Sequence, residues 1–118
     1  MAELLIEDGA LHVRLSALEK LGALRGDIMI PLRSVTAVRV SDNPWSEELR
    51  GIRAPGTGLP GVISLGTRRG KGILDFAAVY GRAGRAVVVE ASRAGFDRIV
   101  ISSEDAEETA HRIRQSLN

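Results

Sequence analysis

Short apolar segments separated by tight-turn signals run through most of this chain, and they restrict it to a mainly β fold. The clearest signal is Asp8-Gly9, because a two-residue hairpin turn of type I′ needs positive φ at both positions. Apolar and polar residues alternate after it, over residues 11–15, as they do in a half-buried strand. Further turn signals lie at residues 81–84 and 92–95. We therefore expect about seven short strands, joined by tight turns into antiparallel pairs.

The last part of the chain changes from strand-like alternation to helical spacing. Ser103 is a good N-cap, and the acidic residues after it lie where a helix dipole favours negative charge. We expect one amphipathic helix that starts within two residues of Ser103, with an apolar stripe of Ala106, Ala110, Ile113 and Leu117. An antiparallel sheet must roll up or stack to bury one face. The sequence therefore predicts a mainly β fold, a seven-stranded antiparallel barrel or sandwich capped by one C-terminal α-helix.

The inward-facing positions of these segments define an expected core. It consists of Leu11, Val13, Ile30, Leu74, Phe76, Val87, Val89, Ile99, Ile101, Ala110 and Ile113. Asp75 is out of phase with its two apolar neighbours, so we expect its carboxylate on a solvated face. Trp45 either fills the core or anchors an interface, since Trp is enriched at binding hot spots. Leu18, Leu21 and Leu24 are three residues apart, which indicates a short helical segment.

Length and composition predict a single globular domain over residues 1–118, with 44% hydrophobic and 26% charged residues. The net charge of +1 gives no general attraction for nucleic acid. No cysteine is present, which excludes disulfides, thiolate zinc sites and thiol nucleophiles. The only two histidines, His12 and His111, are not in a ligand-spaced cluster, so we expect neither a metal nor another cofactor. The first residues do not resemble a signal peptide, and we expect a cytoplasmic protein.

The segment of residues 50–72 holds seven of the thirteen glycines, five basic residues and no acid. Because glycine and proline interrupt regular structure, we expect mostly loop here, with one strand over residues 62–67. We predict that Arg53, Arg68, Arg69 and Lys71 form an anion- or partner-binding patch, because backbone N–H groups beside arginines suit anions. The alternative is a purely structural connection between sheets. No helix start follows the glycines and no Gly-Lys-Ser/Thr occurs, so neither nucleotide-binding loop motif is present.

The order of strands and helix resembles the pleckstrin-homology-like domains of bacteria. The local likeness lies in residues 28–40, IMIPLRSVTAVRV, and in the section from Trp45 to Gly66 followed by Asp75-Phe76. The resemblance implies a strongly bent seven-stranded sheet with one C-terminal helix. Eukaryotic members of the family bind phosphoinositides through a basic hairpin between their first two strands. Here that hairpin is Asp8-Gly9 and is acidic, which argues against inositol phosphate at that place.

These observations favour a non-enzymatic binding or scaffold module that recognises an unknown protein or an anionic lipid surface, peripheral to the membrane in the second case. They leave homo-oligomers open. No catalytic cluster is evident, because Ser16, Thr57 and Ser64 lack a neighbouring His–Asp pair. The alternative is a small β-barrel enzyme or small-molecule binder, with an internal apolar cavity lined by Leu74, Phe76 and Tyr80. Nucleic-acid binding ranks last, since the aromatic residues are not interleaved with basic ones.

Overall fold

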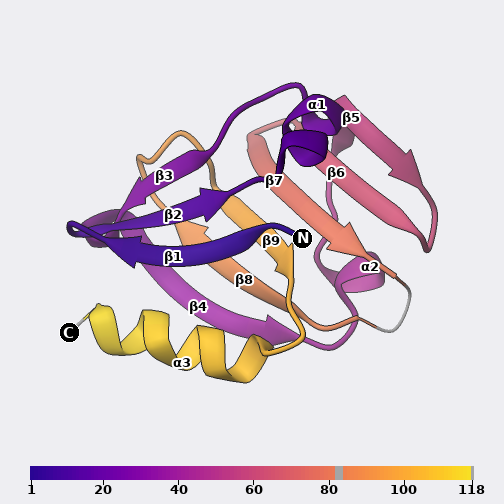
Figure 1. Cartoon of the computed structure of the whole chain (residues 1–118). Coiled ribbons are helices and arrows are strands. Elements are labelled where there is room, and N and C mark those ends of the chain that lie inside the picture. The colour runs from indigo at the N-terminus through magenta and orange to yellow at the C-terminus, as the bar shows by residue number, and fades with distance from the viewer. Residues whose placement is uncertain (82–83, 118) are drawn as a thin grey trace.

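The computed structural model describes residues 1–81 and 84–117, and this part of the chain forms two β-sheets with a long C-terminal helix (Figure 1). The smaller sheet is antiparallel and has the order β1-β2-β3; its strands are β1 (Glu3–Glu7), β2 (Ala10–Arg14) and β3 (Ile28–Pro31). Asp8 and Gly9 join β1 to β2 with φ angles of 50° and 74°. The predicted hairpin is therefore confirmed.

The larger sheet has the strand order β4-β8-β9-β7-β6-β5. Its strands are β4 (Val35–Ser41), β5 (Ile52–Leu59), β6 (Ile63–Gly70), β7 (Ile73–Tyr80), β8 (Ala86–Ala91) and β9 (Arg98–Ser102). Strand β9 lies between β8 and β7, antiparallel to the first and parallel to the second. A strand inserted between two antiparallel strands must run parallel to one of them. The predicted all-antiparallel sheet is therefore wrong.

The described residues contain nine strands where seven were predicted, and neither sheet closes into a barrel. The main reason is β5, which forms in the glycine-rich segment where loop was expected. The strand predicted over residues 62–67 is confirmed as β6, which extends to Gly70. β5 pairs with β6 on one side only, and an edge strand tolerates Pro55 because one row of its N–H groups needs no partner. The turn predicted at residues 81–84 includes residues 82 and 83, which lie outside the described residues.

Three helices accompany the sheets in the described chain: α1 (Ala17–Ala23), α2 (Pro44–Glu47) and α3 (Ala106–Ser116), with a 3₁₀ turn at Leu32–Ser34. α3 begins three residues after Ser103, and Asp105 occupies its N-cap position, so the predicted start and cap were wrong. Ala106, Ala110 and Ile113 are buried as predicted, whereas Leu117 is exposed. None of the described helices is long and apolar enough to cross a membrane.

The main core lies between the two sheets and α3, on what we call the inner face of the larger sheet. Ten of the eleven predicted core residues are buried there, and Leu74 is partly buried against them. Phe76 is fully buried and packs edge-to-face on Phe96, with ring centroids 6.3 Å apart. Leu74 and Tyr80, which the sequence placed with Phe76 around an apolar cavity, are partly buried and pack against this core.

A second, smaller core covers the opposite, outer face of the larger sheet. It consists of Ala77, Val79, Ala86, Val88 and Val100. Residues 42–51, which we call the crossover segment, carry the chain from β4 at one edge of the sheet to β5 at the other and include α2. Trp45 and Leu49 of this segment pack on the second core, and the indole Nε1 of Trp45 donates to the Gly81 carbonyl at 2.7 Å. Trp45 thus packs in a core, which is one of the two roles that the sequence predicted for it.

Candidate functional site

Charged side chains form a row across the outer face of the larger sheet, beside the second core. From β4 to β6 the row consists of Arg39, Glu90, Arg98, Asp75 and Arg68, with alternating sign. Cross-strand pairing fixes this order, since Glu90 is opposite Arg98, Arg98 is opposite Asp75, and Asp75 is opposite Arg68. Side chains of opposite charge at facing positions stabilise a sheet.

The crossover segment contributes two further charges to this row, Glu48 and Arg50. Glu48 is buried and accepts two hydrogen bonds from Arg39, at 2.6 and 2.8 Å, and one from Arg98 at 3.3 Å. The hydrogen bond from Arg39 is the main reason why the pKa of Glu48 lies below its ordinary value. Arg98 has a buried Nε without a hydrogen-bond partner among the described residues.

Asp75 is buried, which corrects the expectation of a solvated carboxylate. Arg50 of the crossover segment donates to both of its oxygens, from Nε at 2.6 Å and from a terminal nitrogen at 3.0 Å. This two-point contact raises the pKa of the Arg50 guanidinium. The alternation of β7 places Asp75 on the outer face as expected, but the crossover segment lies over that face. Sequence periodicity cannot reveal a cover that comes from another part of the chain.

The structure brings two of the four predicted site residues together. Arg53 and Arg68 are cross-strand partners on β5 and β6. Arg68 donates to the carbonyls of Arg50 and Gly51, both at 3.0 Å, and to the Ser64 hydroxyl at 3.2 Å. Burial, and in second place the positive charge of Arg53, lowers the pKa of the Arg68 guanidinium.

The other two predicted site residues lie apart from this pair. Arg69 follows Arg68 on the same strand, so its side chain starts on the opposite face of the sheet. Lys71 is exposed in the turn between β6 and β7. The patch of four side chains therefore divides, and only Arg53 and Arg68 converge.

Glycines of β5 determine where the Arg53 side chain lies. A Cβ atom at Gly58 would be only 2.0 Å from Cζ of Arg53, and one at Gly56 would be 2.9 Å from its Cγ. The Arg53 side chain therefore lies flat across these two glycines. Gly66 of β6 is opposite Gly56, so the surface under the arginine is bare backbone. The glycine-rich sequence thus provides a flat floor, which residue spacing alone did not predict.

A second candidate site is the exposed side of α1. Leu18, Leu21 and Leu24, which we call the leucine surface, are 80%, 70% and 67% exposed. The same helix buries Glu19 and Ala23, so it presents its largest apolar side chains to solvent. Leu24 also has a left-handed φ of 55°, a conformation that favours glycine.

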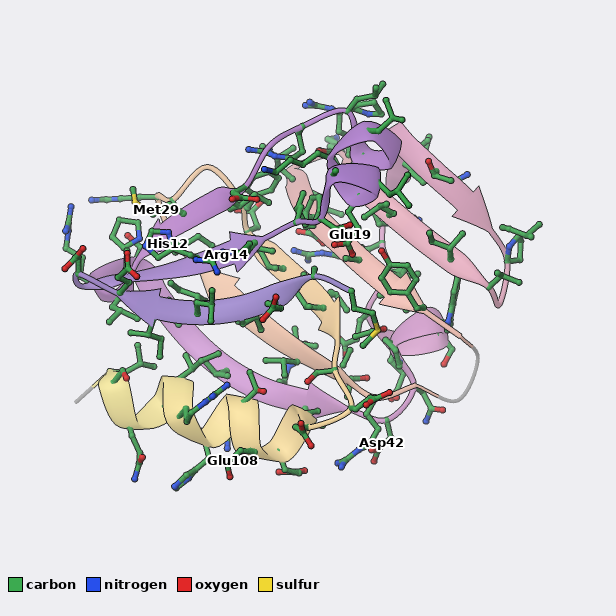
Figure 2. The ribbon with its side chains drawn as sticks, in the orientation of Figure 1. His12, Arg14, Glu19, Met29, Asp42 and Glu108 are labelled. Atoms are coloured by element: carbon green, nitrogen blue, oxygen red, sulfur yellow. The ribbon has the colours of Figure 1, made fainter. Side chains whose placement is uncertain are left out.

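Glu19 is the anchor that fixes this orientation of α1. Its carboxylate (Glu19 is labelled in Figure 2) accepts from the backbone N–H of Ser16 at 2.9 Å in a capping box. The same carboxylate accepts from the Tyr80 hydroxyl at 2.5 Å. Burial, followed by this hydrogen bond, raises the pKa of Tyr80. Gly22 lets α1 approach the sheet closely, and its carbonyl accepts from the Thr57 hydroxyl at 2.8 Å. The Ser16-x-x-Glu19 pattern was the sequence signal that could have identified this anchor.

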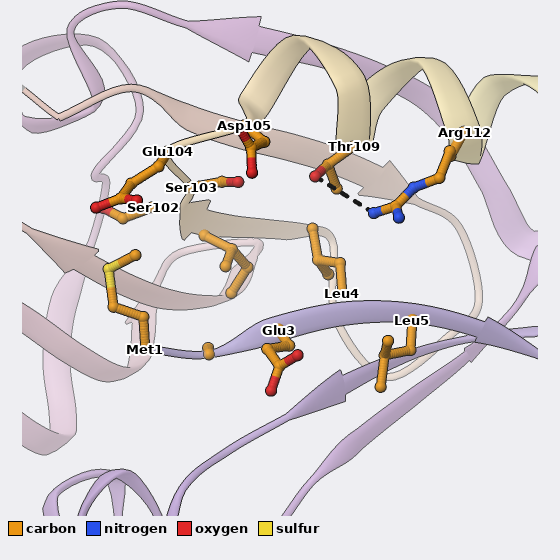
Figure 3. Close-up of a pocket in the computed structure, with 12 residues that line it drawn as sticks. Met1, Glu3, Leu4, Leu5, Ser102, Ser103, Glu104, Asp105, Thr109 and Arg112 are labelled. Carbon is orange, nitrogen blue, oxygen red and sulfur yellow. Dashed lines mark hydrogen bonds between the residues drawn. The ribbon is translucent and has the colours of Figure 1, made fainter.

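Two surface hollows accompany these sites. One, of about 310 Å³, lies between α1 and β6 and is lined mainly by apolar side chains, including Leu18, Ile63 and Tyr80. The other, also about 310 Å³, lies between β1 and the start of α3 and has a mixed lining (Figure 3). Its lining includes three acidic residues, Glu3, Glu104 and Asp105, and the basic residue Arg112. Among the described residues, no group of three acidic or histidine side chains is placed to hold a metal ion.

No protein family, curated protein sequence or solved structure matches this chain. The site must therefore be interpreted from its own residues.

Proposed function

We propose that this chain is a binding module that holds a protein partner on its leucine surface. The observation that carries this proposal is the exposure of three leucines on a helix that buries a glutamate instead. A fully buried leucine contributes roughly 1.5–3 kcal/mol, so leaving three in water forfeits a large stabilisation that a partner could recover. Contiguous exposed apolar residues of this kind typically mark interaction sites.

The geometry of α1 supports the proposal, because the helix is held in this orientation from several sides. The capping box fixes the start of the helix, and the Thr57–Gly22 and Tyr80–Glu19 hydrogen bonds attach the helix to β5 and β7. A surface that is already ordered loses less conformational entropy on binding. The hollow beside Leu18 could accept one apolar side chain of the partner.

Other exposed apolar residues extend the same side of the molecule. Leu59 ends β5 and is opposite Ile63, which lines the hollow together with Leu18. Leu59 is itself exposed, as is Val62 in the turn to β6. We infer that the partner covers α1 and the turn between β5 and β6 with an apolar helix or strand. The filled interior around Phe76 favours such a binding module over the alternative of an enzyme with an internal cavity.

Site-specific crosslinking tests this function. The photoreactive residue p-benzoylphenylalanine is placed at position 21 in one protein and at position 29 in a control, since Met29 on β3 is also an exposed apolar residue. In the cells that make the protein, we expect a discrete protein adduct from position 21 and none from position 29. The additional substitutions Leu18→Ser and Leu24→Ser should remove the adduct, while the thermal melt changes little because both side chains are exposed.

Sedimentation of the purified protein decides whether the partner is a second copy of this chain. A dimer that the two serine substitutions dissociate would identify the partner as the chain itself. Equal adducts from positions 21 and 29 would refute the proposal. Partition onto anionic vesicles that depends on the leucines, without a protein adduct, would replace the protein partner by a membrane surface.

A further inference from the structure

Two positive side chains converge at one point of the outer face, between β5 and β6. The Arg53 guanidinium lies over Gly58, and a terminal nitrogen of Arg68 is 3.2 Å from the Ser64 hydroxyl. Gly58 and Ser64 are cross-strand partners. The two guanidinium groups are therefore neighbours, although like charges repel.

No carboxylate among the described residues forms an ion pair with either arginine. The nearest acid in the row, Asp75, has both oxygens occupied by Arg50. Arg68 instead uses backbone carbonyls and a hydroxyl, which satisfy its N–H groups without neutralising its charge. Asp75 acts on Arg68 only at longer range, so the converging pair keeps a net positive charge.

The surface around the pair leaves room for a ligand. Gly56, Gly58 and Gly66 contribute no side chains to the floor, and both Arg53 and Gly56 are exposed to solvent. The available donors are guanidinium N–H groups, which suit the oxygens of a tetrahedral oxyanion. An anion with two negative charges would match the two positive charges here, whereas a carboxylate would match only one.

We propose that Arg53 and Arg68 hold a phosphate group above the Gly58–Ser64 pair. The phosphate is either free in solution or part of a larger molecule such as an anionic lipid. Arg53 supplies an exposed guanidinium that can adjust to the ligand, and Arg68 supplies one that the crossover segment holds in place. The site is separate from the leucine surface, so each proposal can fail without the other.

The test is an NMR titration that follows the Nε–Hε signals of the arginines. Inorganic phosphate is added to the whole protein at neutral pH, and sodium chloride of equal ionic strength is added to a parallel sample. We expect saturable shifts at Arg53 and Arg68 with phosphate only. The variant Arg53→Gln should weaken phosphate binding about tenfold, the factor that corresponds to about 1.4 kcal/mol. The control Arg14→Gln, on the exposed side of β2, should change the affinity for phosphate less than about twofold.

Gly58→Ala is the sharper variant because it keeps every charge and displaces only the Arg53 guanidinium. Gly58 does not have a positive φ, and its added Cβ meets the flexible end of Arg53 rather than backbone, so the fold should persist. Phosphate should bind this variant about as weakly as it binds the Arg53→Gln variant. Binding equal to that of the wild type, or shifts that chloride reproduces, would overturn the proposal.

A second arm identifies the source of the phosphate group. Phosphatidylcholine vesicles with and without phosphatidic acid are sedimented with the wild type and with Gly58→Ala. Binding that needs both phosphatidic acid and Gly58 supports the site with a lipid headgroup as its ligand. Saturable phosphate shifts without vesicle binding support the site with a soluble phosphate. Vesicle binding that is equal in both proteins, without phosphate shifts, would overturn it.

Discussion

Replacing Glu48 by glutamine should remove the negative charge that Arg39 and Arg98 share under the crossover segment. Glu48 is 6% exposed, and its carboxylate accepts three hydrogen bonds from two arginines. Glutamine keeps the shape but loses the charge, which leaves the largely covered Arg98, 15% exposed, with only the more distant Glu90 carboxylate as its partner. Removing one partner of a buried pair costs about 3–5 kcal/mol, and we expect the lower end, about 3 kcal/mol, because the Arg39 side chain is 37% exposed and regains water.

The contribution of Glu48 should depend on pH with a definite sign. Its pKa in the folded protein lies below the ordinary value of 4.5, so folding favours the charged carboxylate. The stabilisation is therefore complete above the ordinary value and is lost as the pH falls through the lower, folded-state value. The difference in unfolding free energy between the wild type and Glu48→Gln should accordingly shrink in acid.

Urea denaturation at neutral pH and at a series of acidic pH values measures both effects. Glu90→Gln is the matched control, because Glu90 belongs to the same row but is 36% exposed and contacts Arg39 and Arg98 at 3.4 and 3.7 Å. We expect it to cost less than about 1 kcal/mol. Equal losses in the two variants, or a Glu48→Gln difference that does not vary with pH, would refute this reasoning.

Four further substitutions test the core and the backbone, each by denaturant melts. Phe76→Ala should cost roughly 3–5 kcal/mol because the ring is fully buried; a loss under about 1 kcal/mol would place it at the surface. Leu24→Gly should stabilise the protein by about 0.5–1 kcal/mol, because relief of the left-handed φ exceeds the entropic cost of glycine; a net loss would mean that the leucine side chain packs in the free protein. Gly66→Ala should cost about 3 kcal/mol, since its Cβ would be 2.4 Å from the carbonyl oxygen of Pro55. Gly72→Ala meets no atom within 4 Å and should lose only about 1 kcal/mol, so equal losses at the two glycines would contradict the steric explanation.

The glycine-rich segment shows why part of the fold could not be predicted. Glycine and proline weaken a strand locally, and this made residues 52–59 resemble a loop. Pairing with β6 along one edge overrides that local preference, and a bulge between Arg53 and Gly56 absorbs the irregularity. The basic composition of this segment did point to Arg53 and Arg68, which the structure places side by side, but not to the way Arg69 and Lys71 separate from them.

The sequence by itself determined the features that depend on neighbours in the chain. These are the hairpin at Asp8-Gly9, the alternation that buries most of the predicted core, and the apolar stripe of α3. Only the tertiary structure decided where β9 enters the sheet, that Arg50 covers Asp75, and that α1 turns its leucines outward. Each of these rests on contacts between residues far apart in the chain, such as Tyr80 with Glu19. Local periodicity determines which side chains share a face. The segment that packs on that face decides whether those side chains form a core, ion pairs or a binding surface.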